Sequence, residues 1–467
     1  MKYKTMAARV GNYVGWLALL FINSSSAFAD SIAFSTNSYA AGTGPFSVRI
    51  ADVNNDGKLD LITANLGTSF KGTTITILTN TGNGAFSFST TINTTNVAVD
   101  VEVGDINGDG LADLLVCGGT TNYITVLTNN GHGSYAFSTP VITSSIAVSS
   151  TLTDLRGLGM LDMICSETPY PDQATTTNYL SIYTNNGSGL FGLNASYMAG
   201  LSGTQIAVAD VNGDGKTDLI NCNINANTLT VWTNNGSAHF SLQTNYIVGS
   251  NPRRVRAVDV NGDGKPDLIE ANNNAAGTFL IFTNNGSGIF GLSQTISTSG
   301  STPDVTAADI NGDGYIDLIG INNNGGGIPM MMVYTNNRTG YFSLNQQISA
   351  PDGHYSVAAA DLNNDGKPDF VTVNFGFLNS VLVGLNQSTI PTASQPPTLT
   401  ISNQGNLTKV TWPASANGWS LLQSTSLTSS PWTPSGFLGY PILNDGTNLS
   451  LWLPGNQGTG FFRLLHP

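Results

Sequence analysis

A nine-residue pattern rich in aspartate and asparagine recurs seven times along this chain of 467 residues. In six copies Asp stands at positions 1, 5 and 9 and Asn at position 3, and Gly stands at position 6 in all seven. Carboxylate and amide oxygens at alternating positions of a tight turn suit Ca²⁺, whereas Mg²⁺ prefers a strict octahedron and keeps its waters. Because His and Cys are absent from these loops, zinc is disfavoured, and the pattern predicts calcium sites.

The candidate ligands in each complete copy are the side chains at positions 1, 3, 5 and 9 and the backbone carbonyl at position 7, where the residue type varies. Positions 4 and 6 are Gly or Asn and are expected to have left-handed backbone. If these residues only satisfied turn backbones, three carboxylates within nine residues would repel one another in six places. The candidate calcium ligands are Asp52, Asn54, Asp56, Lys58, Asp60, Asp105, Asn107, Asp109, Leu111, Asp113, Asp210, Asn212, Asp214, Lys216, Asp218, Asp259, Asn261, Asp263, Lys265, Asp267, Asp309, Asn311, Asp313, Tyr315, Asp317, Asp361, Asn363, Asp365, Lys367 and Asp369.

The third copy, residues 154–162, departs from the pattern because Arg156 stands at position 3 and Leu158 at position 5. Two ligands are lost there and a cation is gained. We therefore expect about six calcium ions and none in the third copy, with Arg156 paired to Asp154 or Asp162. Dispersed sites of near-identical chemistry predict a structural role for the ions.

The period of the pattern indicates the elements that position these loops. Each repeat has room for four short strands, such as 206–209, 219–222, 229–233 and 240–243, with an Asn-Gly turn between the third and the fourth. Four strands in each of seven repeats predict an all-β chain built on a seven-bladed β-propeller. The first Asp of the repeats falls at positions 52, 105, 154, 210, 259, 309 and 361.

The seventh repeat ends at 381–386 and lacks the last turn and the aromatic residue of the other repeats. Residues 32–36 precede the first Asp pattern as a fourth strand precedes the next repeat elsewhere. We predict that 32–36 completes the last blade beside 380–385. This closure would join the two ends of the propeller and remove two exposed sheet edges.

The pattern D-x-N-x-D-G-x-x-D at this period resembles the FG-GAP (VCBS-type) repeats of the integrin α-subunit propeller and of many exported bacterial proteins. The resemblance covers about residues 30–388. It implies calcium loops between the first and second strands of each blade and ligand sites on the opposite face. It is specific for fold and metal and says little about biochemical activity.

The two ends of the chain lie outside the propeller, which we place at 30–386. Residues 1–29 resemble a cleaved signal peptide, with early Lys and Arg, an apolar run too short for a comfortable membrane anchor, and Ala27-Phe28-Ala29 before the cleavage point. A secreted or cell-surface protein is therefore expected, with no transmembrane segment after cleavage. Residues 387–398 form a Pro-bearing linker, and 399–467 predict a small C-terminal β-sandwich that resembles immunoglobulin-like or fibronectin-like appendages.

Charge and missing motifs exclude several classes of function. The formal net charge of −13 disfavours nucleic acid as a partner. The sequence has no G-x-S-x-G, phosphate-loop or H-E-x-x-H motif. The four histidines are interpreted as solvated turn residues. A monomer is expected.

Charged and polar side chains outside the loops gather near the start of the first strand in several repeats. We expect them to surround the axial channel on the face away from calcium and to form a ligand site, and Tyr355 is assigned the same register as Asp100, Arg254 and Asp304. The alternative is a hydrated channel with compensating charges. The candidate ligand-binding residues are Asp100, Glu102, Arg253, Arg254, Arg256, Asp304 and Tyr355.

Together these features predict a recognition or adhesion module for an extracellular protein or glycan. An enzyme is the alternative, namely a polysaccharide lyase or hydrolase, since some members of the resembled family carry such activity. It requires Asp100, Glu102, Asp304, Arg254 and Tyr355 to converge on one pocket. A third hypothesis is a purely structural part of a cell-surface assembly.

Overall fold

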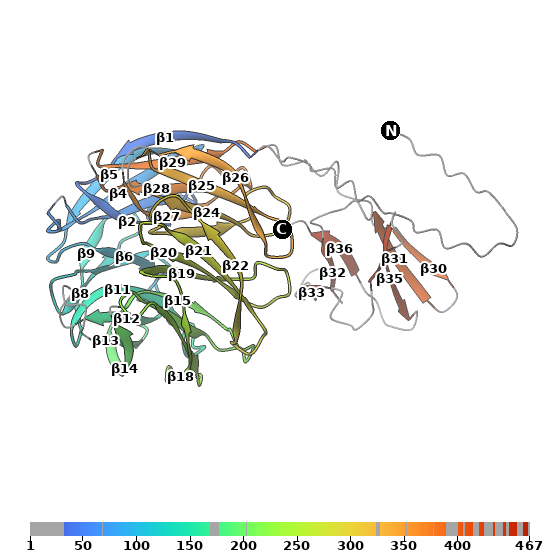
Figure 1. The fold of residues 1–467 in the computed structure, drawn as a ribbon, viewed down its shortest axis with the longest axis horizontal. Helices are drawn as coiled ribbons and strands as arrows, with labels where there is room; N and C mark the ends of the chain where they lie inside the picture. Colours follow the sequence, from blue (N-terminus) through green and yellow to red (C-terminus); the bar gives the residue numbers. More distant parts are fainter. Residues whose placement is uncertain are drawn as a thin grey trace, which may run out of the picture.

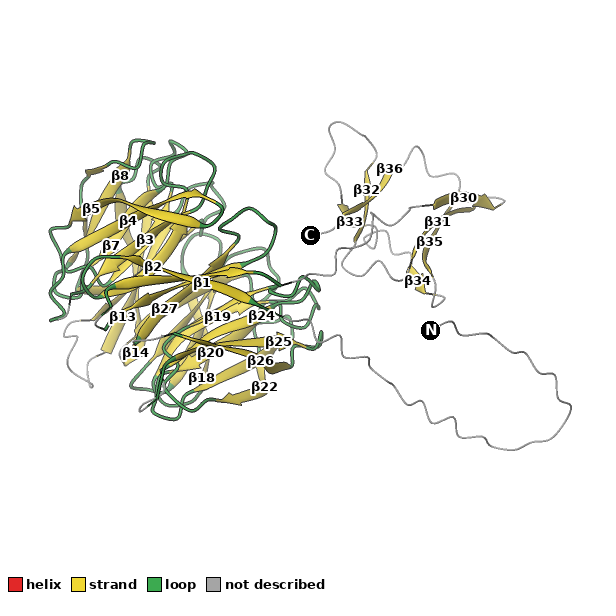
Figure 2. Cartoon of the chain, turned by 90° about the horizontal axis from the view of Figure 1, so that it is seen from above, coloured by secondary structure: helices red, strands yellow, loops and turns green. Residues whose placement is uncertain are grey.

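The computed structural model describes residues 32–388, except 68, 169–176, 202, 324–326, 351–352 and 377, and separate strands between 400 and 465. In residues 32–388, seven antiparallel sheets surround a central axis as the blades of a propeller, as predicted (Figures 1 and 2). The part of the chain that the structure describes contains no helix that could span a membrane.

Each blade is built outward from the axis by strands that follow one another in the sequence. The first strands are β2 (Pro45–Ala51), β6 (Asp100–Gly104), β11 (Ile146–Thr153), β15 (Gly203–Ala209), β19 (Pro252–Val258), β23 (Val305–Ala308) and β27 (His354–Ala360). The second strands are β3 (Asp60–Asn65), β7 (Asp113–Cys117), β12 (Asp162–Thr168), β16 (Asp218–Asn223), β20 (Asp267–Asn272), β24 (Asp317–Asn322) and β28 (Asp369–Asn374). The third strands are β4 (Thr74–Gly82), β8 (Tyr123–Asn129), β13 (Thr177–Asn185), β17 (Thr228–Asn234), β21 (Thr278–Asn284), β25 (Met330–Asn336) and β29 (Ser380–Asn386).

The outermost strands vary more than the inner ones. They are β5 (Ala85–Asn93), the pair β9 (Tyr135–Phe137) and β10 (Val141–Ile142), β14 (Phe191–Leu201), β18 (Phe240–Ile247), β22 (Phe290–Ser297), β26 (Phe342–Ser349) and β1 (Phe34–Ala40). Both β9 and β10 pair with β8, so the outer strand of the second blade is interrupted.

The core consists of seven apolar clusters, each shared between two neighbouring blades. Second strands such as β3 and β20 are buried at every residue, because neighbouring blades cover both of their faces. Position 2 of each loop contributes a buried aliphatic side chain to these clusters, and burying one such side chain stabilises the fold by about 2 kcal/mol. These residues are Val53, Ile106, Leu155, Val211, Val260, Ile310 and Leu362.

The ring is closed by the beginning of the propeller, as predicted. Figure 1 shows β1 beside β29, and their antiparallel register runs from Phe34 opposite Asn386 to Ala40 opposite Ser380. Phe34 also packs against Phe370 of the same blade, with ring centroids 5.0 Å apart. Closure therefore rests on both backbone pairing and aromatic packing.

The C-terminal strands form two small antiparallel sheets. One contains β30 (Thr400–Gln404), β31 (Leu407–Pro413), β35 (Asn448–Pro454) and β34 (Ile442–Asn444), and the other contains β33 (Thr433–Pro434), β32 (Ser420–Ser424) and β36 (Phe461–Leu465). The β-sandwich itself stays a prediction. The predicted signal peptide, 1–29, and residues 389–398 of the predicted linker lie outside the described residues.

Candidate functional site

All seven Asp loops join the first and second strands of their blades, so that position 9 is the first residue of each second strand. Positions 4 and 6 have positive φ in every loop, as predicted, for example 79° at Gly108 and 83° at Gly110. A Cβ at position 6 would be strained by this backbone. The loops therefore share one conformation.

The second loop shows how this conformation arranges the oxygens. Asp105 Oδ1 accepts from the backbone N–H of Gly108 at 2.7 Å, and its Oδ2 accepts from Gly110 at 2.9 Å. Asn107 Oδ1 accepts from the N–H of Asp109 at 2.9 Å. One oxygen each of Asp105, Asp109 and Asp113 lie within 4.8 Å of one another. Such a group of hard oxygen donors fits a calcium ion.

The Asp at position 9 differs from the others because it is buried and bonded to the blade. Asp60 accepts from the backbone N–H of Val53 at 3.1 Å and from that of Asn80 at 2.7 Å. Burial raises the pKa of this carboxyl in the six complete loops, to about 7 for Asp317 and about 6 for Asp369. Position 9 thus anchors the loop to the third strand, besides being a candidate ligand.

Position 7 has a side-chain role that the sequence pattern did not indicate. In four loops a Lys at this position pairs with the Asp at position 5, for example Lys58 Nζ with Asp56 Oδ2 at 3.0 Å. The same pair forms between Lys216 and Asp214 at 3.2 Å. The ammonium group reduces the carboxylate repulsion in these exposed loops, and each such surface pair contributes less than about 1 kcal/mol.

The third loop holds its own cation, as predicted. Arg156 donates from Nε and Nη2 to the two oxygens of Asp162, at 2.9 and 2.7 Å, and from Nη2 to the carbonyl of Asn185 at 2.7 Å. Asp162 is the partner, whereas Asp154 accepts backbone N–H groups of the loop. The guanidinium fork fits the carboxylate in the two-bond geometry that only Arg offers.

An Asn at or near the end of each third strand links neighbouring blades, which sequence reasoning missed. Asn284 Nδ2 donates to the carbonyl of Val211 in the preceding blade at 2.8 Å and to that of Pro266 in its own blade at 2.9 Å. The sequence does contain a sign of this role. The shortened seventh repeat lacks the turn that follows the third strand in the other repeats, but it retains the corresponding Asn, Asn386. The corresponding bonds to preceding blades come from Asn80, Asn129, Asn185, Asn234, Asn336 and Asn386, at 2.7 to 2.9 Å.

The candidate acids of the channel are all engaged in ion pairs. Arg49 donates to Glu102 at 3.0 Å and to Asp100 at 3.1 Å, and Ser47 and Ser149 donate to the two oxygens of Asp100 at 2.6 and 3.1 Å. Burial raises the pKa of Glu102, against the opposing effect of Arg49. This group joins blades 1, 2 and 3.

A second group lies on blades 5, 6 and 7. Asp304 Oδ1 lies 3.0 Å from Arg256 Nη2, and its Oδ2 lies 3.6 Å from Arg254 Nε. The N–H of Val357 also donates to Asp304, at 3.1 Å. The structure therefore brings five of the six charged candidates into two ion-pair groups, one in which Arg49 faces two acids and one in which Asp304 faces two arginines.

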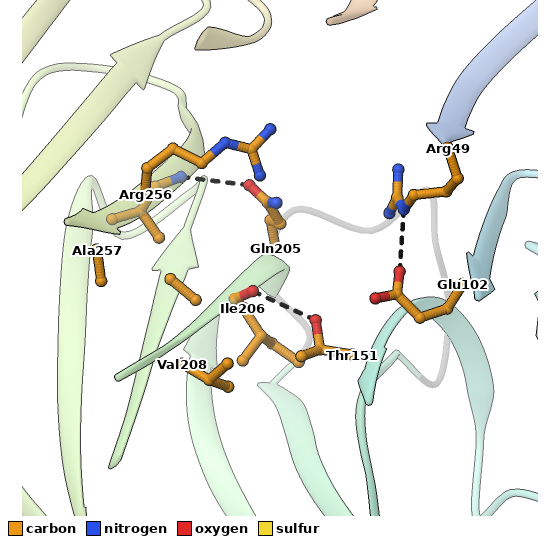
Figure 3. Close-up of a pocket in the computed structure, with 10 residues that line it drawn as sticks. Arg49, Glu102, Thr151, Gln205, Ile206, Val208, Arg256 and Ala257 are labelled. Atoms are coloured by element: carbon orange, nitrogen blue, oxygen red, sulfur yellow. Dashed lines mark hydrogen bonds and ion pairs between the residues drawn. The ribbon is translucent and has the colours of Figure 1, made fainter. Parts of the chain in front are cut away.

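A cavity of about 270 Å³ is lined by residues of the first strands of blades 1 to 5. Figure 3 shows the pair of Arg49 and Glu102 on one side of this cavity and Arg256 near Gln205 on the other. The remaining lining is largely aliphatic, from Ile206, Ala207, Val208, Val255 and Ala257. The cavity therefore has polar groups at its sides and an apolar wall.

The register assigned to Tyr355 was wrong by one residue. Ser356, five residues before Asp361, occupies the position of Asp100 and Arg254, as the strand pairing shows. Tyr355 instead corresponds to Phe46 and Arg253, and all three meet: the Arg253 guanidinium lies 5.4 Å from the Phe46 ring centroid and 5.2 Å from that of Tyr355. The sequence spacing already gives this register, because the β-bulge before Ser356 in β27 also occurs at the same place in β2 and β19.

One histidine also differs from its interpretation as a solvated residue. His354 is fully buried at the start of β27. Its Nδ1 lies 3.1 Å from Thr372 Oγ1 and its Nε2 lies 3.1 Å from the carbonyl of Ala350. It is therefore a packed, hydrogen-bonded residue of the seventh blade.

Comparison with known families agrees with this architecture. The FG-GAP-like repeat family matches residues 66–116, 105–165, 154–221, 210–270, 259–320 and 309–372. The chain belongs to this family. Apart from the first, each match begins at the first Asp of one loop and ends in the second strand of the following blade, so it spans parts of two neighbouring blades.

Solved structures share the fold of this FG-GAP-like chain at low sequence identity. BBS1N, solved in complex with ARL6DN, has a TM-score of 0.53 at 14% identity, covering 77% of this chain and 98% of its own. A Lactobacillus plantarum protein has a TM-score of 0.51 at 13% identity, covering 67% and 87%. A comparison with curated proteins found no match.

Proposed function

We propose that this chain is an exported, calcium-stabilised propeller that recognises a protein or a glycan outside the cell with the face opposite the Asp loops. This proposal rests on the ion pairing of the acidic side chains in the channel. Asp100, Glu102 and Asp304 are all held in ion pairs, which favours a preformed binding surface over a pair of acid and base catalysts.

The loops support the metal part of the proposal. Six of them carry the full set of oxygen donors, and the backbone hydrogen bonds described above hold those donors in place. A calcium ion would neutralise the repulsion between the carboxylates of each loop. Ligands would be the side chains at positions 1, 3, 5 and 9, with the carbonyl at position 7.

The recognition part of the proposal leaves the class of partner to experiment. The BBS1N propeller was solved with ARL6DN bound, and this likeness in fold supports a protein as one class. Aromatic and arginine side chains at the mouth support a glycan as the other. The signal-like segment 1–29 supports export.

Screening for ligands and for turnover tests this proposal. The calcium-loaded protein is applied to a glycan array and to extracellular proteins, and acidic polysaccharides are assayed for cleavage. We expect binding without cleavage. Cleavage that Asp304→Asn abolishes, in a variant that keeps its melting temperature, would replace recognition by the lyase or hydrolase alternative.

A further inference from the structure

Four aromatic rings and one guanidinium form a connected surface on the face opposite the Asp loops. The ring centroids of Phe46 and Tyr355 are 5.0 Å apart, Tyr355 and Phe375 are 5.1 Å apart, and Phe70 and Phe375 are 5.6 Å apart. Arg253 lies over the first two rings. We name these five side chains the mouth cluster.

Phe70 is held outward by a constrained loop. Its side chain is 61% exposed, and its φ of 57° is rare for a bulky residue. The N–H of Gly72 donates to the carbonyl of Leu66 at 2.6 Å, and a Cβ on Gly72 would lie 2.5 Å from the backbone nitrogen of Gly67. Strain that the surroundings maintain in this way is characteristic of ligand sites.

The charge of the mouth cluster favours an anionic ligand. Arg253 is its one ionised member at neutral pH, and burial and the neighbouring Arg254 lower the pKa of its guanidinium only to about 10. The nearby Asp304 faces Arg254 and Arg256 and also attracts Arg253, so the arginines in this region outnumber the acid. A carboxylate on the ligand would therefore meet a cation and aromatic faces.

The size of the mouth cluster favours a sugar over a protein surface. A stable protein interface buries about 800 Å² on each partner and involves some twenty residues. Here the Phe70 ring projects into solvent, and the rings of Phe46, Tyr355 and Phe375 around it are half-buried. Together they make a platform of about the size of a sugar ring.

Resting on the recognition function proposed above, we infer that the mouth cluster binds a carboxylate-bearing sugar, the uronic acid residue of an acidic polysaccharide. The C–H face of the sugar would lie against Phe70 and Phe375, and its carboxylate against Arg253. Rings held rigidly in this way lose little conformational entropy on binding.

Titration calorimetry with tetragalacturonate tests this inference, using full-length protein loaded with calcium and freed of excess ion. We expect Phe70→Ala and Arg253→Gln each to weaken binding at least tenfold. Phe88→Ala, which removes a 64% exposed Phe from the outer strand β5, should leave binding unchanged. Methyl-esterified tetragalacturonate, the same sugar without charge, should bind at least tenfold more weakly.

Three outcomes would overturn the inference. Binding of tetragalacturonate that survives both substitutions would reject the mouth cluster as the site. Equal binding of the methyl ester, or binding of an acidic peptide alone, would reject the ligand class. In these cases the proposed recognition function would still stand. If the protein binds neither a glycan nor a protein in the screen above, both the recognition function and the uronic acid site are rejected. Melting temperatures show that each variant is folded.

Discussion

Individual side chains of this propeller have structural roles that their residue type alone does not indicate. The Asn at the end of each third strand and Arg156 are both polar groups that connect backbone segments far apart in the sequence. Their bonds are largely shielded from water, so removing one partner leaves a buried polar group without compensation.

Replacing Asn284 by Ala tests the link between blades. The carbonyls of Val211 and Pro266 would each lose a donor, and we expect the free energy of unfolding to fall by about 2 kcal/mol. Urea unfolding measures this loss. Thr283→Ala, at a half-buried neighbouring position, is the control, and an equal loss in both variants would show that Asn284 has no special role.

Replacing Arg156 by Ala tests the cation of the third loop. Asp162 is fully buried, so losing its two-bond partner should cost about 3 kcal/mol of stability. Arg338→Ala removes an ion pair whose Arg side chain is 49% exposed, and should cost less than about 1 kcal/mol. If the two variants melt alike, the Arg156 pair does not stabilise the loop.

Glu270 predicts a pH dependence of stability. It is fully buried, its Oε2 accepts from Asn272 at 2.6 Å, and its Oε1 meets no hydrogen-bond donor among the described residues. Burial raises the pKa of Glu270 well above its usual value. The folded protein therefore retains a proton that the unfolded chain releases, and stability falls as pH rises from about 4.5 toward the raised pKa.

Glu270→Gln should reduce this dependence because Gln is neutral at every pH. We expect the variant to gain melting temperature over the native chain at pH 8, and to gain less at pH 5. Both are measured at one saturating calcium concentration. A difference between the two chains that does not change with pH would contradict the assignment.

At the scale of elements, strand β1 determines whether the ring closes. The N–H of Gln387 donates to Ala33 and the N–H of Ala41 donates to Asn379, and hydrogen-bonded pairs alternate along an antiparallel ladder. With Asn37 opposite Val383, the N–H of Asn37 points to β29, and that of Ser38 points away.

Asn37→Pro should therefore destabilise the propeller by about 2 kcal/mol, since one ladder bond is lost and β29 keeps an unpaired carbonyl. Ser38→Pro should change stability little, because Pro is tolerated where the strand N–H faces outward. Thermal unfolding compares the two. Equal melting temperatures would mean that β1 contributes little to closure.

At the scale of the whole molecule, we expect calcium to be the largest single source of stability. Removing it with EGTA should lower the melting temperature strongly, because each site contributes about 2.7 kcal/mol when calcium is at a hundred times its Kd. Elemental analysis should find about six ions per chain. An unchanged melting temperature with EGTA would contradict the proposed metal role.

The double variant Arg156→Asn with Leu158→Asp completes this test. It restores the pattern of the other six loops in the third repeat, so about seven ions should bind. Unchanged stoichiometry would show that the third loop lacks calcium for a reason other than these two residues.

Much of this architecture is determined by the sequence itself. The Asp loops, the four strands of each repeat and the shortened seventh repeat predict seven blades closed by the N-terminal strand, and the structure has this fold. These features are local, because turn backbone and strand patterning depend on residues within one repeat. The missing ligands of the third loop also pointed to Arg156 as its internal cation.

Only the tertiary structure decided which groups meet across blades. The ring geometry brings Arg253 of blade 5 to Phe46 of blade 1 and Tyr355 of blade 7, and it turns each third-strand Asn toward the preceding blade. Such contacts join residues that are far apart in the chain and depend on the angle between blades, so no spacing within a repeat records them.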